Sequence, residues 1–297
     1  MSGRVWLAVA VAVALAAVGV SYWVFFQRPE HAAEVAAPVE PETLRVSQLT
    51  GQVGVSGESG EFRPARVGDT LSSRDRIRTG DDGAAQLLAA DGSTVKLLAA
   101  TDVRVAELRR ELKRLHLAAG MVEADVRDDP ARVLEVELDD HGGAARTRGA
   151  AFTASANGAG SAAVATRRGE VILSARGKEV VIRTGQYARL SPGAPPEAPA
   201  PLPPSLFLKV EWPPTASKKS QVVVAGVTAP GARVQVAGHY IPVDDKGVYR
   251  TEVPLSDGVH QLQVHAVDVG GHVVDEKSPR ILVDTKTDFT VVPPKWK

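Results

Sequence analysis

Short segments of alternating hydrophobic and polar residues run through most of this chain, and alternation of this kind predicts β-strands. Residues 85–88 and 93–97 flank Asp91-Gly92, and an Asp-Gly pair between apolar runs is among the strongest short signals for a hairpin. The Arg-Gly-Lys sequence at residues 176–178 indicates a second hairpin. Turns built from Gly and Asp recur as far as residue 190, so we expect one β-domain over residues 44–190.

The apolar pattern near the N-terminus is different, because residues 6–26 form an uncharged run of 21 residues. As a helix rising about 1.5 Å per residue, this run would span roughly 30 Å, the thickness of a bilayer core. We expect an uncleaved transmembrane anchor in the inner (cytoplasmic) membrane, with residues 1–5 as a cytoplasmic stub and the bulk of the chain periplasmic. A cleaved signal peptide is the alternative, but its apolar region is normally about 7–15 residues and precedes small residues. This run is longer and ends in Tyr-Trp-Val-Phe-Phe at residues 22–26.

Polar and proline-rich segments divide the rest of the chain. Residues 27–43 read as a tether between the anchor and the first domain. Seven of the 14 residues in 191–204 are proline, which predicts an extended, semi-rigid linker that reaches up to roughly 43 Å at about 3.1 Å per residue. A second β-rich block covers residues 205–285, and residues 286–297 form a short tail.

The segment from residue 104 to residue 117 fits two periodicities. Leu108, Leu112 and Leu115 fall at i, i+4 and i+7, with basic residues between them, as in an amphipathic helix. Val103 and Val105, and likewise residues 115 and 117, alternate as in a strand. The alternation favours strand, and the helix remains open.

The bulk composition excludes several classes of function. Lys plus Arg and Asp plus Glu both number 35, so no net positive charge favours nucleic acid as a partner. The chain contains no cysteine, which rules out disulfides, thiolate metal sites, cysteine nucleophiles and lipid modification of an N-terminal cysteine. Aromatic residues make up only 5%, as expected for many short, Val-rich strands with tight turns.

Charge is unevenly distributed along the first domain. Residues 104–114 carry five basic and two acidic groups, whereas residues 123–140 carry eight acidic and two basic groups. One interpretation is a basic patch that binds an anionic envelope polymer such as lipid headgroups or lipopolysaccharide. The candidate binding residues are Arg109, Arg110, Lys113 and Arg114. The other interpretation, which we favour, is that the two segments are neighbours and offset each other across paired strands.

The spacing of Gly and Asp in the first domain resembles that of the FecR domain. Arg78-Thr79-Gly80 followed by Asp82-Gly83 and then by residues 91–93 carries the likeness. Further landmarks in the expected order lie at residues 51–53, 68–71, 168–171 and 185–188. The resemblance implies a solenoid-like domain of stacked strands outside the cytoplasm, which in the best-known relatives relays a signal from an outer-membrane receptor. One departure is Arg-Gly-Ala-Ala-Phe at residues 148–152, where such families usually carry Arg-Gly-Thr-x-Phe.

Residues 205–285 are similar to bacterial immunoglobulin-like modules. About seven short strands at spacings of about 8–12 residues, with Pro230-Gly231 and Asp257-Gly258 as turns, indicate a β-sandwich. Modules of this kind are spacers or binding surfaces more often than catalysts. The fold class we expect is therefore mainly β: a single transmembrane helix, a FecR-like domain, a Pro-rich linker and an immunoglobulin-like sandwich.

No sequence pattern points to an enzyme, a cofactor or a metal. Seven histidines occur, but His260 and His265 would point to opposite faces of a strand, and a surface or turn role is favoured for His239 and His272. The sequence therefore predicts a non-enzymatic, membrane-anchored envelope protein that presents two modules for binding an envelope protein or an anionic polymer. The alternative is an extracytoplasmic sensor of a FecR-type signalling system that acts through another membrane protein. A third class is a carbohydrate-active enzyme or its accessory module.

Overall fold

Strands make up almost all of the regular structure in the computed structural model, which describes residues 42–57, 60–138, 140 and 142–285. The prediction of a mainly β protein is confirmed over these residues. The expected stub (1–5), anchor (6–26) and tail (286–297), and all but the last two residues of the tether (27–43), lie outside them. No helix within the described residues is long and apolar enough to cross a membrane.

The strands form two groups, which we call the N-terminal body (β1–β16) and the C-terminal body (β17–β26). The N-terminal body contains β1 (Leu44–Thr50), β2 (Val53–Ser56), β3 (Phe62–Pro64), β4 (Thr70–Leu71), β5 (Arg76–Thr79), β6 (Ala84–Ala89), β7 (Thr94–Leu97), β8 (Asp102–Leu108), β9 (Leu112–Asp125), β10 (Val133–Leu138), β11 (Gly143–Thr147), β12 (Ala150–Ala156), β13 (Ala162–Ala175), β14 (Lys178–Arg183), β15 (Gln186–Leu190) and β16 (Ala200–Pro201). The C-terminal body contains β17 (Leu208–Glu211), β18 (Ala216–Ser217), β19 (Gln221–Thr228), β20 (Arg233–Val236), β21 (His239–Ile241), β22 (Val248–Pro254), β23 (Gly258–His260), β24 (Gln263–Val267), β25 (Val273–Lys277) and β26 (Ile281–Val283).

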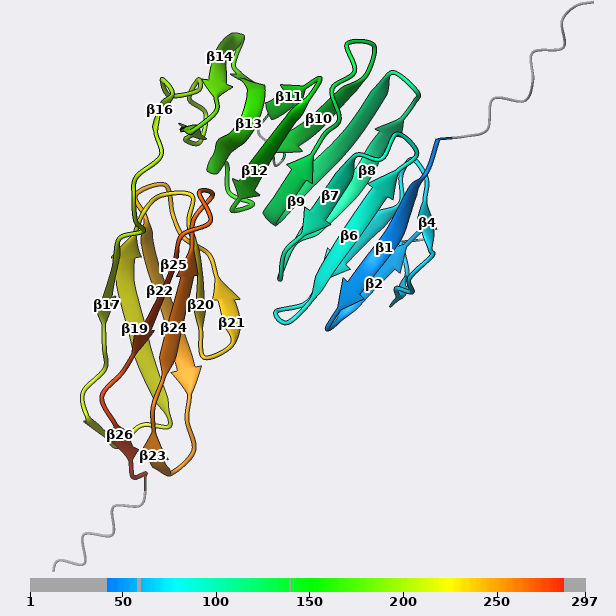
Figure 1. Ribbon diagram of the computed structural model, residues 1–297. Coiled ribbons are helices and arrows are strands. Elements are labelled where there is room, and N and C mark those ends of the chain that lie inside the picture. The colour runs from blue at the N-terminus through cyan, green and yellow to red at the C-terminus, as the bar shows by residue number, and fades with distance from the viewer. Residues whose placement is uncertain (1–41, 58–59, 139, 141, 286–297) are drawn as a thin grey trace, which may run out of the picture. The chain divides into compact units, whose positions relative to one another are not determined.

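Two strands of 14 residues each, β9 and β13, connect two sheets within the N-terminal body (Figure 1). The first sheet runs in the order β4-β1-β6-β7-β9-β12-β13-β15-β16, and the second in the order β3-β2-β5-β8-β9-β10-β11-β13-β14. The C-terminal half of β9 pairs in the first sheet, and its N-terminal half pairs in the second. Most pairs are antiparallel, but β9 and β10 run parallel.

One hydrophobic core serves both sheets of the N-terminal body. It contains Leu87 and Val95 from the first sheet and Ile77, Leu115 and Val136 from the second, all at most 4% exposed. Ile77, Leu87 and Val95 alternate with exposed or half-buried neighbours along their strands, as the period of two requires.

The local turn predictions are confirmed. β6 and β7 form an antiparallel hairpin around Asp91-Gly92, where Gly92 has a φ of 82°. β13 and β14 form a hairpin in which Arg176 and Gly177 have φ values of 52° and 72°. The ambiguous segment is strand on both sides of a turn at residues 109–111, so the helical alternative is wrong. The alternation of Val and Leu toward the core therefore outweighs the helical spacing of the leucines.

The proline-rich segment 191–204 differs from the extended spacer expected from its composition. Within it, β16 pairs with β15 at the edge of the first sheet. The backbone N–H of Glu197 donates to Arg189 (3.0 Å), and that of Leu202 donates to Gly185 (2.9 Å). Each proline lacks a backbone N–H only at its own position. An edge strand tolerates proline because the backbone groups on its outer side need no partner strand. The segment therefore lies along β15.

The C-terminal body consists of three small sheets around one core. Their orders are β17-β19-β22, β18-β26-β23 and β21-β20-β24-β25. Val224, Val234, Val264 and Ile281 are fully buried in this core, and Tyr249 is 1% exposed. The described residues of both bodies form one compact unit.

Candidate functional site

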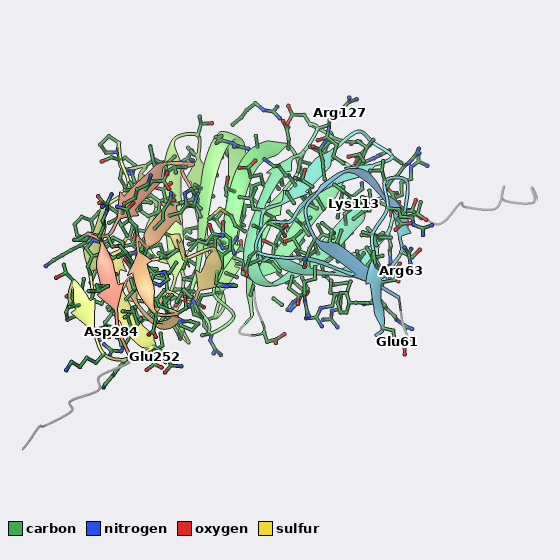
Figure 2. All side chains as sticks on the ribbon, turned by 90° about the horizontal axis from the view of Figure 1, so that it is seen from below. Glu61, Arg63, Lys113, Arg127, Glu252 and Asp284 are labelled. Atoms are coloured by element: carbon green, nitrogen blue, oxygen red, sulfur yellow. The ribbon has the colours of Figure 1, made fainter. Side chains whose placement is uncertain are left out.

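The four basic residues singled out from the sequence do not form one free patch. Arg109 and Arg110 are exposed in the turn between β8 and β9. Lys113, which is labelled in Figure 2, is buried, with only 6% of its side chain exposed. Its Nζ lies 2.7 Å from Asp91 Oδ2 and 3.0 Å from Glu42 Oε1. A lysine held in this way between two carboxylates is not available to an external anion.

Arg114 is also engaged, on the opposite face of β9 from Lys113. Its Nε donates to Glu135 (2.7 Å), and its second contact is with Glu107 (3.2 Å). Glu135 accepts a further bond from Arg146 (2.8 Å). Burial raises the pKa of Glu135, but hydrogen bonds from Arg146 and Arg114 outweigh it and leave the pKa lowered. The favoured interpretation, that basic and acidic segments are neighbours across paired strands, is confirmed by the parallel register that places Glu135 opposite Arg114.

The FecR-like motif at residues 78–83 builds a different surface. The Thr79 hydroxyl donates to the carbonyl of Leu98 (2.6 Å) and accepts from the N–H of Thr101 (2.8 Å). The N–H of Ala100 donates to the carbonyl of Gly80 (2.7 Å). These bonds fix the turn at residues 98–101, in which Ala100 has a φ of 44°. The left-handed conformation of a non-glycine residue is held here by its neighbours.

Arg233 on β20 contacts this turn. Its guanidinium donates to the carbonyl oxygens of Ala99 (2.5 Å) and Ala100 (3.1 Å), and it lies over the Tyr240 ring at 4.0 Å from the centroid. Burial lowers the pKa of Arg233 to about 10, against the opposing influence of Tyr240 and Asp81. No ion pair to Arg233 occurs among the residues that the structure describes. The positive charge of Arg233 is therefore held by two backbone carbonyl groups and the face of the Tyr240 ring.

Asp81 of the motif also faces the C-terminal body. Its Oδ2 lies 3.0 Å from His239 Nδ1, and its Oδ1 accepts from the backbone N–H of Tyr240 (3.2 Å). The carbonyl of Asp81 lies 3.4 Å from the Gln235 side-chain amide. The turn of the motif thus serves as a docking point for β20 and β21.

Two residues at the end of β12 complete the contact. Ser155 Oγ donates to the carbonyl of Gly231 (2.8 Å), and Asn157 Nδ2 donates to that of Val243 (3.0 Å). Asn157 Oδ1 also accepts the N–H of Ser161 (3.0 Å), so one side chain orders its own turn and binds the other body. We call the contacts of Asp81, residues 98–101, Ser155 and Asn157 with β20, β21 and their loops the seam.

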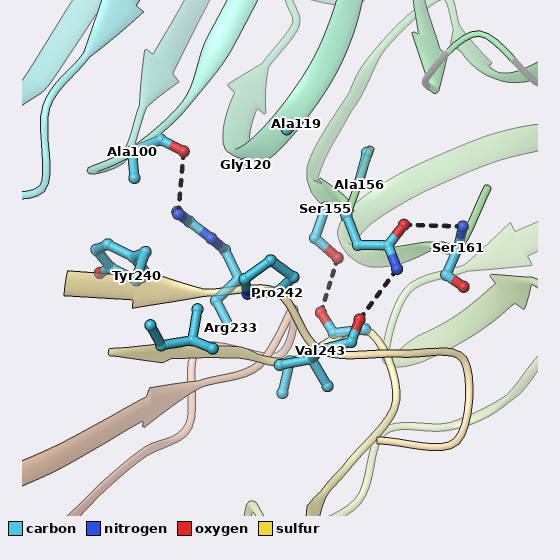
Figure 3. Close-up of a pocket in the computed structure, with 14 residues that line it drawn as sticks. Ala100, Ala119, Gly120, Ser155, Ala156, Ser161, Arg233, Tyr240, Pro242 and Val243 are labelled. Carbon is cyan, nitrogen blue, oxygen red and sulfur yellow. Dashed lines mark hydrogen bonds between the residues drawn. The ribbon is translucent and has the colours of Figure 1, made fainter. Parts of the chain in front are cut away.

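A cavity of about 170 Å³ lies within the seam (Figure 3). Small side chains and glycine form much of its wall, including Ala100, Ala119 and Gly120, and Arg233 and Tyr240 lie along it. The wall offers a guanidinium, hydroxyls and backbone groups, which recognise and hold a small polar molecule. It carries no carboxylate pair or base-activated nucleophile of the kind that hydrolytic catalysis uses.

Three histidines of the C-terminal body pair with different carboxylates. His265 lies 2.9 Å from Asp275, and His272 lies 3.0 Å from Asp268 on its own turn. His239 pairs with Asp81 as described above. Within the described part of the chain, no group of three or more His, Asp or Glu side chains is placed to hold a metal ion.

The seam is predictable from the sequence only in part. The motif that contains Thr79 and Asp81 is evident in the sequence, but no local pattern marks Arg233, Tyr240 or Asn157 as its partners. Their local patterns are ordinary, because Arg233 occupies a strand position beside alternating Val residues. Its contact with Ala99 joins positions 134 residues apart, and no local signal in one sequence reports such a contact.

Comparisons with known proteins identify the motif region. Residues 75–172 match the model of the FecR protein family. Two crystal structures of a protein from Parabacteroides distasonis ATCC 8503, provisionally assigned as an anti-sigma factor, align at 17% identity and a TM-score of 0.38. They cover 42% of this chain and 59% of that one. A polysaccharide lyase aligns at 12% identity and a TM-score of 0.21, over 80% of this chain and 40% of the lyase. This chain thus spans about three fifths of the first relative's length. No curated protein matches.

Proposed function

We propose that this protein is the extracytoplasmic sensor of a FecR-type signalling system and acts without catalysis, by contact with another membrane protein. The observation that carries the proposal is the FecR domain at residues 75–172. As part of the proposal, residues 6–26 anchor the chain in the inner membrane, with the described bodies in the periplasm. The partner is an envelope protein, and nucleic acid is not expected to bind.

The seam supports signalling over passive presentation. Arg233 and Tyr240 of the C-terminal body contact the turns that the FecR motif orders. A ligand or partner that changes one body would therefore bias the position of the other, because the contacts are specific and few. A passive display of two modules would instead need a free spacer, whereas residues 200–201 of the 191–204 segment pair with β15.

We also infer that residues 205–285 form an immunoglobulin-like module and that residues 44–190 form one domain of stacked strands. The three small sheets around a single buried core support the first inference. The two long strands shared between sheets support the second. Both modules then lie on the same side of the membrane, where either can meet a partner.

The test is recovery of the partner from membranes. Cells that produce the full-length chain are treated with a short cross-linker. The chain is then purified from the membrane fraction, and the proteins cross-linked to it are identified by mass spectrometry. We expect one membrane protein to be enriched, and a limited set of transcripts to change when this chain is deleted. A Thr79→Val variant should reduce the enrichment of this membrane protein and change the same transcripts as the deletion does. The variant removes the hydroxyl that holds Leu98 and Thr101. Arg110→Ala, at an exposed residue of the β8–β9 turn, is the matched control.

Two results would contradict the proposal. One is a deletion strain with an unchanged transcript profile, together with cross-linking that recovers no membrane protein. The other is a sigma factor that co-purifies with the wild-type chain and is lost when residues 2–5 are scrambled, which would make the chain itself the direct regulator. A chain that captures only an anionic envelope polymer would favour the presentation function.

A further inference from the structure

Arg233 is a half-buried cation without a carboxylate partner among the described residues. A guanidinium has five N–H donors, and two of the hydrogen bonds that Arg233 makes go to the carbonyls of Ala99 and Ala100. Asp81 acts on Arg233 electrostatically, but its two side-chain oxygens are occupied by His239 and the N–H of Tyr240. Burying a charge without a counter-ion is costly unless an anion or water compensates it.

The cavity beside Arg233 has the size and lining for a small anion. Its volume of about 170 Å³ is well below the roughly 300 Å³ or more of pockets for larger ligands. The wall combines the guanidinium with the methyl groups of Ala100, Ala119 and Ala156. Figure 3 shows the Arg233 side chain extending from its strand to the Ala100 carbonyl across this space.

We propose that the cavity binds a small carboxylate, with its two oxygens on the remaining N–H donors of Arg233 and its short apolar end against the alanine wall. Two parallel N–H···O bonds are the preferred geometry of a guanidinium with a carboxylate. Residues of both bodies line the cavity, Ala119 and Ser155 from one and Arg233 and Tyr240 from the other. The ligand therefore stabilises the seam in its docked arrangement. Binding does not require the signalling role proposed above.

The experiment measures binding of three probes to the purified full-length chain by isothermal titration calorimetry and by thermal unfolding. Acetate supplies the carboxylate, acetamide is its neutral isostere, and inorganic phosphate is a different anion. We expect acetate to bind saturably and to raise the unfolding midpoint with concentration. Acetamide should bind at least about tenfold more weakly, because it lacks the charge that strengthens hydrogen bonds to a guanidinium.

Variants identify the residue responsible. Arg233→Met should weaken acetate binding by at least about tenfold, whereas Arg250→Met, at an exposed arginine of β22 in the same body, should bind acetate as the wild type does. If Arg233→Met fails to fold, Ala119→Leu keeps the arginine and fills the wall of the cavity, and it should also prevent binding.

Four outcomes would overturn the carboxylate site. These are no saturable acetate binding, equal binding of acetamide, binding of phosphate alone, or acetate binding that survives both Arg233→Met and Ala119→Leu. Saturable acetate binding in a chain whose deletion changes no transcripts would leave the site standing and contradict the sensor function alone.

Discussion

Replacing Lys113 by Met should destabilise the N-terminal body strongly. Met preserves most of the aliphatic stem but removes the ammonium that lies 2.7 Å from Asp91 and 3.0 Å from Glu42. The Glu42 oxygen lies at ion-pair distance but has no hydrogen-bond geometry, so we assign the larger share of the interaction to Asp91. The two carboxylate side chains are only 13% and 11% exposed, so water cannot replace the lysine.

The expected loss is about 3 kcal/mol in the free energy of unfolding. Removing one partner of a buried ion pair typically costs about 3–5 kcal/mol, because the other charge stays buried without compensation. Arg132, whose Nη1 lies 3.4 Å from Asp91 Oδ2, remains and places the loss at the lower end of this range. Since domains are stable by about 5–15 kcal/mol, a change of this size shifts the unfolding midpoint markedly.

The assay is urea unfolding of wild type and variants, followed by far-UV circular dichroism. Arg110→Met is the control, because it removes an exposed charge from the adjacent turn and should change stability by less than about 0.5 kcal/mol. The double variant Lys113→Met, Asp91→Asn should recover more than about 1 kcal/mol, since the amide removes the uncompensated charge at position 91. If Lys113→Met loses less than about 1 kcal/mol in the free energy of unfolding, or if the double variant recovers none of the loss, then Asp91 is not both buried and charged.

Three further predictions concern acid, backbone strain and the seam. Burial raises the pKa of Asp91, but the hydrogen bonds from Lys113 and Ser93 and the charge of Lys113 together outweigh it, and the pKa falls to about 2 from 3.8. About 2 kcal/mol of stability, present above pH 4, is therefore lost as the pH falls from about 4 through 2, which thermal unfolding across this range will measure. Gly120→Ala should cost more than about 2 kcal/mol in urea unfolding, because the φ is +110° and a Cβ would lie 2.5 Å from Thr101 Cα. Asn157→Ala removes the 3.0 Å bond to Val243 and should speed hydrogen exchange around residue 243 without unfolding the N-terminal body.

Much of the fold could be predicted because its signals are local. A turn such as Asp91-Gly92 is specified by the need for positive φ, and the structure places φ of 82° at Gly92. The alternation of Val103 and Val105 reports which side of β8 faces the core, and both are at most 1% exposed. Patterns of this kind depend only on residues that are close along the chain, so they can be recognised in a single sequence.

The candidate site was less predictable, because the roles of its charges depend on register. In sequence, Lys113 and Arg114 are members of one basic run. In the structure they point to opposite faces of β9, where one meets Asp91 and the other Glu135. Residues 191–204 illustrate the same limit. Their composition shows which backbone N–H donors are missing, but it does not show that Glu197 and Leu202 donate to residues in or next to β15.

The sharing of β9 between two sheets constrains the order in which the chain can assemble. Its N-terminal half needs β8 and β10, and its C-terminal half needs β7 and β12. As a ribosome releases the chain, β9 lacks its last partner until residue 156 has emerged. β12 in turn pairs with β13, which ends at residue 175. Neither sheet can therefore close early, and a nascent chain shorter than this exposes unpaired strand edges that a chaperone would have to cover.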